Sequence, residues 1–187
     1  MRVDSNQAVS ATRAWITEFV VGLGICPFAS SVLGDLELLV YEGSSLAELS
    51  GRLEMELTRF ASADAGAHPT SILIAPNVLR DFADYNEFLG VVDGVLAGVG
   101  LEGVVQIASF HPSYLFAEGQ PGDVGHYTNR SPYPMFHMLR EEHVSQAVAA
   151  HPDTLKIPEE NIARLRELGL THIRLMLEKC LTLSHRV

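Results

Sequence analysis

Three short apolar runs alternate with amphipathic helical segments in the first two thirds of the chain. Residues 36–41, 70–75 and 103–110 are each apolar and end at turn-forming or proline-containing segments, which is typical of buried strands. Residues 44–61 and 80–99 carry apolar side chains at helical spacing. Two successive strand–helix–strand units favour right-handed crossovers between parallel strands. The sequence therefore predicts an α/β fold with a small mixed or parallel sheet and helices on its faces.

The remaining segments are predicted to be mainly helical. Apolar spacing indicates helices over residues 8–23, 135–149, 158–168 and 173–181. The helical C-terminal third is expected to cover one edge or one face of the sheet. With 47% hydrophobic residues and no linker-like segment, residues 1–187 are expected to form a single domain.

Composition restricts the binding partners and the cellular location that we expect. The formal net charge of -10 argues against nucleic acid and against an anionic membrane surface as partners. Cys26 and Cys180 have no paired spacing, which suits a reducing compartment. The N-terminal residues lack a secretion-signal pattern, and no apolar run is long enough to span a membrane. We expect a soluble cytoplasmic protein, whose oligomeric state the sequence leaves open.

Residues 109–143 concentrate the polar side chains that suggest a site. His111 follows the last predicted strand and is held before Pro112, at the sheet edge where open α/β folds bind ligands. A long loop over residues 113–129 follows, and such loops often contribute to binding. The helix predicted from Met135 would place His137, Arg140 and Glu141 on one face.

These residues predict an anion site with a proton-transfer group. His111 is the candidate general base, with His137 and Glu141 assisting. Arg130 and Arg140 are candidates to hold a phosphate or carboxylate near a helix N-terminus. The alternative for both arginines is an ion pair that fastens the loop. Asn129 and Tyr133 are candidates to contact the ligand, or else to form the turn and pin the loop.

Two further candidates carry more specific chemistry. His137 and Glu141 would be one helical turn apart, as two ligands of a divalent metal can be, but the segment does not match the known helical zinc signature. No cofactor is therefore predicted, and a divalent metal is the minority alternative. Cys26 is a candidate nucleophile, with packing as a small apolar side chain as its alternative.

Four ordered motifs resemble one known family. These are ICPFA (25–29), QIASFHPSYLFA (106–117), YTNRSPYPMFHMLRE (127–141) and IPEENI (157–162). Together they are similar to the bacterial domain of unknown function 1415 family, over about residues 15–169. The resemblance implies that Cys26, His111, Asn129, Arg130, His137, Arg140 and Glu141 occupy motif positions of that family. It implies no substrate.

Three kinds of function follow as expectations. The first is a small enzyme that acts on an anionic small molecule by hydrolysis or group transfer, with His111 moving the proton. The second is a non-catalytic binding or regulatory module that uses the same pocket, and the third is a metal-dependent hydrolase. A purely structural role for the motif residues is the remaining alternative.

Overall fold

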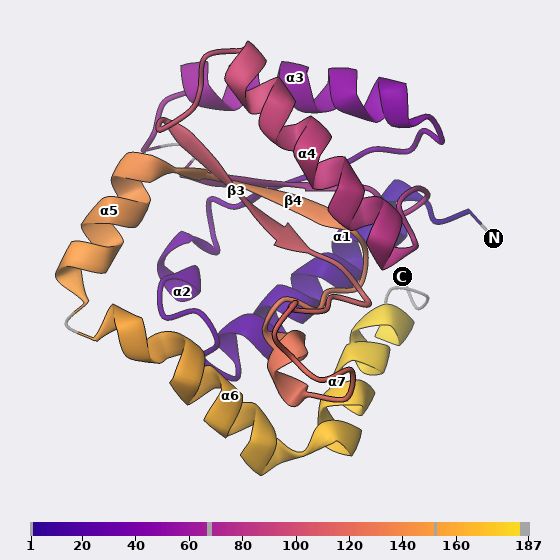
Figure 1. The fold of residues 1–187 in the computed structure, drawn as a ribbon, viewed down its shortest axis with the longest axis vertical. Coiled ribbons are helices and arrows are strands. Elements are labelled where there is room, and N and C mark those ends of the chain that lie inside the picture. The colour runs from indigo at the N-terminus through magenta and orange to yellow at the C-terminus, as the bar shows by residue number, and fades with distance from the viewer. Residues whose placement is uncertain (1, 67–68, 152, 184–187) are drawn as a thin grey trace.

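A four-stranded mixed sheet lies between two helical layers in the computed structural model, which describes residues 2–66, 69–151 and 153–183 (Figure 1). The strand order is β1 (Glu37–Val40), β2 (Thr70–Ile74), β4 (Met135–Arg140) and β3 (Val105–Phe110). β1 is parallel to β2, and β4 is antiparallel to both β2 and β3. The three strands predicted from the sequence therefore run in one direction, and the prediction of a small mixed sheet is confirmed.

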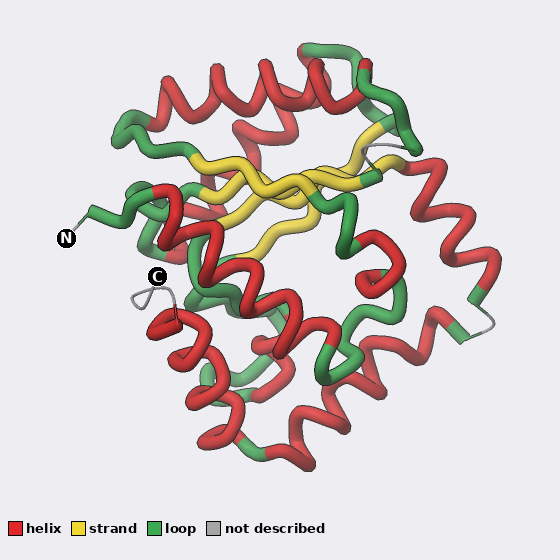
Figure 2. Tube along the Cα trace, turned by 180° about the vertical axis from the view of Figure 1, so that it is seen from behind, coloured by secondary structure: helices red, strands yellow, loops and turns green. Residues whose placement is uncertain are grey.

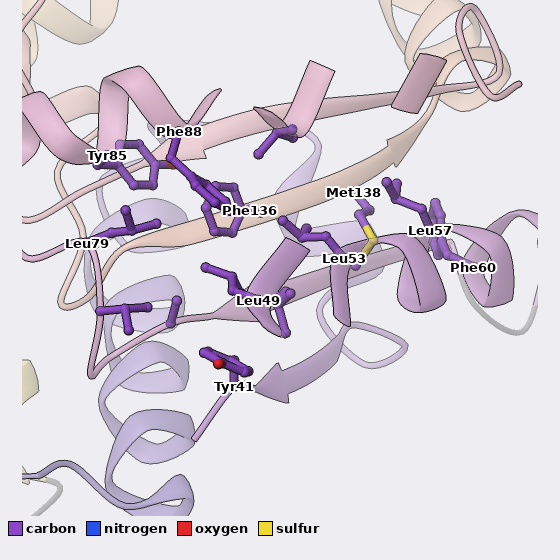
Figure 3. Close-up of a cluster of buried hydrophobic side chains, with 14 of the residues drawn as sticks. Tyr41, Leu49, Leu53, Leu57, Phe60, Leu79, Tyr85, Phe88, Phe136 and Met138 are labelled. Atoms are coloured by element: carbon purple, nitrogen blue, oxygen red, sulfur yellow. The ribbon is translucent and has the colours of Figure 1, made fainter. Parts of the chain in front are cut away.

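The two crossover helices cover one face of the sheet, here called the α3–α4 face. They are α3 (Leu46–Ser62), which Ser45 caps, and α4 (Phe82–Gly98), which Asp81 caps through the backbone N–H groups of Ala83 and Asp84. Their apolar sides meet Phe136 and Met138 of β4 in a buried cluster (Figure 3). The predicted helices at 44–61 and 80–99 are thus confirmed.

The opposite face, here called the α1 face, is covered by segments from both ends of the chain. The N-terminal helix predicted over residues 8–23 is present as α1 (Ser5–Ala14), which continues directly as the π-helix η1 (Trp15–Val21). α1 and η1 pack against α7 (Leu170–Leu183), as Figure 2 shows from behind. Trp15, Phe19, Ile72 and Ile173 are among the residues buried there.

Shorter elements connect these layers. They are α2 (Ala29–Val32), η2 (Val124–Thr128), α5 (Glu141–Ala150), η3 (Thr154–Lys156) and α6 (Ile157–Leu168). α6 packs on η2, which lies in the connection between β3 and β4, and α7 contributes Ile173 to the cluster on the α1 face. Gly169, with φ of 79°, separates α6 from α7. None of the helices in the described part of the chain combines the length and the apolar character that a membrane span needs.

The helix predicted over residues 135–149 is wrong in its first half. Residues Met135–Arg140 form β4, and the helix begins only at Glu141. The apolar side chains of this segment alternate: Phe136 and Met138 face α3 and α4, whereas Met135 joins the cluster on the other face. Because both faces of a central strand are buried, its sequence reads as a continuous apolar run that also fits a helix.

Tyr85 links α4 to the ends of two strands. Its hydroxyl donates to the Met135 carbonyl at 2.7 Å and accepts from the Phe110 N–H at 3.1 Å. The side chain is 0% exposed, and burial raises the pKa of its phenol.

We predict that Tyr85→Phe destabilises the protein by roughly 2–4 kcal/mol, because two buried backbone groups lose their partner. Chemical denaturation would measure the loss of unfolding free energy. The matched control is Tyr114→Phe, which removes a half-buried hydroxyl that lies 3.2 Å from Ser109 Oγ. Equal losses in the two variants would contradict a special role for Tyr85.

Candidate functional site

Hydrogen bonds connect the motif segments that follow β3 and precede β4 into one cluster, here called the β3-end cluster, at the carboxyl end of β3. The His111 N–H donates to the Asn129 carbonyl at 3.2 Å, and Asn129 Nδ2 donates to the Ser109 carbonyl at 3.1 Å. Arg130 Nε donates to the Tyr114 carbonyl at 3.2 Å. The structure therefore brings His111, Asn129 and Arg130 together, at the sheet edge where the sequence places them.

His111 uses both of its ring nitrogens within the protein. Nδ1 accepts from the Ser113 N–H at 3.0 Å, so Nε2 carries the proton and donates to the Leu79 carbonyl at 3.0 Å. The residue is 0% exposed. Burial lowers the pKa of His111, and Arg130 lowers it further, against the opposing effects of Leu79, Arg80 and Asp81. A neutral imidazole that holds the Leu79 segment against β3 is a structural connection, and its predicted role in proton transfer remains a prediction.

Two arginines meet at Tyr127. The Arg130 guanidinium carbon lies 4.3 Å from the centre of the Tyr127 ring, and Arg174 Nε of α7 donates to the Tyr127 hydroxyl at 3.1 Å. Tyr127 itself is 4% exposed, while Arg130 is half-buried and Arg174 is exposed. In the part of the chain that the structure describes, neither arginine forms an ion pair with a carboxylate. Sequence reasoning missed Arg174 because it lies in the last helix, outside residues 109–143, where the candidate residues concentrate.

Arg140 and Glu141 lie at the other end of the sheet. Arg140 ends β4, donates to the carbonyls of Phe60 and Ala63 at 2.7 and 3.0 Å, and stacks on the Phe60 ring. The carboxylate of Glu141 accepts from Gln106 Nε2 at 3.4 Å. The prediction that Arg140 joins Arg130 at a helix N-terminus is therefore wrong: the two residues flank β4 at opposite ends. Arg140 instead binds the carbonyls at the C-terminal end of α3.

His137 lies in the middle of β4 and points to the α1 face. Its register partners are Ile72 of β2 and Ala108 of β3. Nε2 lies 2.5 Å from the hydroxyl of Thr70, which also donates to the Met138 carbonyl at 3.2 Å. When the single hydroxyl proton of Thr70 is assigned to the Met138 carbonyl, Nε2–H is assigned as the donor to Thr70 and Nδ1 as the unprotonated nitrogen. Burial lowers the pKa of His137 to about 4, so the imidazole is neutral near pH 7.

His137, Arg140 and Glu141 do not share a face. Successive side chains of a strand point to opposite sides, so His137 and Arg140 face different layers, and Glu141 begins α5. Among the described residues, no group of three or more histidine, cysteine, aspartate or glutamate side chains is placed to hold a metal ion. The geometry on which the minority metal hypothesis depended is therefore not present at His137 and Glu141.

Cys26 lies beside a second hydrogen-bonded cluster, here called the α6 cluster, which the other two motif segments form. It is a partly buried free thiol in the turn between η1 and α2. Beside it, Asn161 Nδ2 of α6 donates to the Ile25 carbonyl at 2.6 Å, and Arg164 Nη1 donates to the Leu23 and Gly24 carbonyls at 2.6 and 2.9 Å. These contacts connect the ICPFA and IPEENI segments and fasten α6 to the end of the π-helix.

Tyr133 is half-buried against the cluster on the α1 face. Burial and the nearby Asp4 carboxylate raise the pKa of its phenol. Its carbonyl accepts from Ser131 Oγ at 2.7 Å, which fixes the turn before β4. Two open surface depressions lie elsewhere, on α3 and between α3 and α4, and they are lined by residues such as Glu54, Met55 and Val91. None of the predicted site residues lines either depression.

We predict that His137 makes the fold sensitive to acid. Its pKa in the folded protein is about 4, below that of an unfolded imidazole at about 6.5, so the unfolded chain binds more protons between these values. Stability should therefore fall as the pH drops from about 6.5 towards 4, by up to ~3 kcal/mol from this residue.

The measurement is urea unfolding at about pH 7 and about pH 5, with wild type and His137→Gln compared. Glutamine keeps an N–H donor for Thr70 but cannot titrate, so the variant should lose less stability than wild type between the two pH values. His172→Gln, at an exposed position on α7, controls for the removal of one imidazole. Identical losses in wild type and His137→Gln would contradict the assignment.

Comparison with known proteins agrees with the family that the four motifs suggest. The family described as "Protein of unknown function (DUF1415)" matches residues 7–174. No curated protein and no solved structure matches the chain. The match covers most of the sequence, including both hydrogen-bonded clusters and the whole sheet, so the chain belongs to the DUF1415 family.

Proposed function

We propose that this protein binds a small anionic molecule, one that carries a phosphate or carboxylate group, at the arginine pair. The arginine pair is Arg130 and Arg174, whose guanidinium groups both contact Tyr127. The observation that carries the proposal is that these two cations lie at one side chain without an ion-pair partner among the described carboxylates, in a chain of net charge -10.

The contacts of the two side chains support this use. Each arginine donates through Nε to an acceptor in the described part of the protein, Tyr114 for Arg130 and Tyr127 for Arg174. These bonds orient the guanidinium planes, while the terminal N–H groups are the donors that bind carboxylate and phosphate in a bidentate way. Preorganised donors lose less conformational entropy on binding, which favours affinity. Arg130 is partly exposed and Arg174 is exposed, so a ligand can reach them.

The proposed function is binding of the anion without catalysis. The sequence predicts hydrolysis or group transfer with His111 as the proton-transfer group, but both of its ring nitrogens are bonded to backbone groups and the residue is 0% exposed. A general base needs to reach the proton that it removes. The contacts of His111 thus favour the binding module over the enzyme. We also propose a cytoplasmic location, which the two free cysteines, Cys26 and Cys180, support.

We predict that Arg174→Gln weakens the binding of the anion by about tenfold, because one of two charge-assisted contacts is lost. Isothermal titration calorimetry with inorganic phosphate and, separately, with succinate measures the affinity and distinguishes phosphate from carboxylate recognition. Higher salt should weaken binding in both arms, since the pair is partly exposed.

The matched control is Lys179→Gln, which removes one positive charge from an exposed position of the same helix. It should keep the wild-type affinity. Arg174→Lys should fall between wild type and Arg174→Gln, because lysine keeps the charge without the planar fork. If neither anion binds wild type, or if Lys179→Gln weakens binding as much as Arg174→Gln, the proposed site is wrong.

A further inference from the structure

The connection between β3 and β4 exposes two large apolar side chains beside the arginine pair. Leu115 and Phe116 are each 41% exposed. They directly follow Tyr114, whose carbonyl accepts from Arg130 Nε at 3.2 Å. Because consecutive Cα atoms are only ~3.8 Å apart, Leu115 and Phe116 lie within about one and two residue lengths of this contact. Exposed apolar surface and the arginine pair therefore occur side by side.

The Phe116 ring is held in place by its neighbours in the loop. It lies 5.0 Å from the Tyr114 ring and 6.0 Å from the His126 ring, to which it is nearly parallel at 24°. The Phe116 N–H donates to His126 Nδ1 at 3.1 Å, and His126 Nε2 bonds the Gln120 carbonyl at 2.7 Å. The exposed part of the ring is thus a preformed apolar surface, which a ligand can cover at little cost in conformational entropy.

The same loop leads directly to the arginine pair. His126, which supports the Phe116 ring, is followed by Tyr127, which contacts both Arg130 and Arg174. The connection between β3 and β4 lies beside α7, the helix that carries Arg174 (Figure 1). The support of the exposed ring and the residue at which the arginines meet are therefore neighbours in the chain.

We infer that the anion bound at the arginine pair carries an aromatic ring, which packs on Phe116 and Leu115. This inference rests on the proposed function and narrows the ligand to an aryl phosphate or an aromatic carboxylate. The guanidinium groups bind the anionic group, and a short link to the ring suits an apolar surface that begins within about two residues of the Arg130 contact.

An aromatic body fits this surface better than an aliphatic one. Aromatic rings attract one another in offset or edge-to-face arrangements, with centroids about 4.5–7 Å apart. Phe116 already makes such contacts with Tyr114 and His126, and Tyr114 makes another with Phe82 at 5.1 Å. A ring of the ligand would extend this row of aromatic side chains at its exposed end.

The experiment compares matched anions by isothermal titration calorimetry with the full-length protein. Phenyl phosphate is compared with methyl phosphate, and phenylacetate with acetate, so that each pair shares its anionic group and differs in the ring. We predict that the aromatic member of the pair that binds has a Kd at least about tenfold lower. In Phe116→Ala this advantage should fall below about threefold, while the Kd for methyl phosphate or acetate stays as in wild type.

Two leucine variants complete the test. Leu115→Ala should also reduce the advantage of the aromatic anion, and it decides the question if Phe116→Ala fails to fold. The matched control is Leu46→Ala, which removes a leucine that is 45% exposed on α3, on the other side of the sheet from α7, and should keep the wild-type ratio.

The outcomes separate this inference from the anion site on which it rests. Equal Kd values within a pair, or an undiminished advantage in Phe116→Ala and Leu115→Ala, would overturn the aromatic ligand and leave the anion site intact. Equal losses for both members of a pair would mean that Phe116 only packs the loop, which overturns it as well. If none of the four anions binds wild type, the proposed function is wrong and this inference is wrong with it.

Discussion

The sheet depends on β4, the antiparallel strand that lies between two parallel strands. β2 and β3 do not touch each other; each pairs with β4 along its whole length. Without it, the facing edges of both strands would be unpaired in the interior, which proteins avoid because buried backbone groups need partners. β4 also sets the positions of the candidate residues. Its first residue follows the hydrogen-bonded cluster that contains His111 and Arg130. Its last residue, Arg140, binds the carbonyls at the end of α3.

Residues 109–143 are rich in histidine, and the structure explains two of these side chains. His111 and His126 are both buried, and each accepts a backbone N–H at Nδ1 and bonds a backbone carbonyl through Nε2. A neutral imidazole is suited to a loop interior because it satisfies one donor and one acceptor with a single ring. The loop between β3 and β4 is thereby held without regular secondary structure over most of its length. His137 differs, since its Nε2 contacts a side-chain hydroxyl, that of Thr70.

The arginines differ in what their guanidinium groups contact. Arg140 and Arg164 bind backbone carbonyls, and Arg59 pairs with Glu56 and Glu37 beside the sheet. Arg130 also binds a backbone carbonyl, that of Tyr114, but it and Arg174 both contact the Tyr127 side chain and have no carboxylate in contact among the described ion pairs. In an acidic molecule, positive charge left without an ion-pair partner is a local exception to the overall field, and this supports the proposed anion site.

The sequence by itself determined the three strands that run in one direction, the two crossover helices between them and the place of His111 at the edge of the sheet. These follow from local periodicity and local capping, which act within a few residues of the chain. The tertiary structure alone decided that Met135–Arg140 is a strand, because a segment buried on both faces has no alternation to reveal it. It also decided that Arg130 is joined by Arg174 and not by Arg140, since the pairing of residues from separate elements depends on packing that no local pattern encodes.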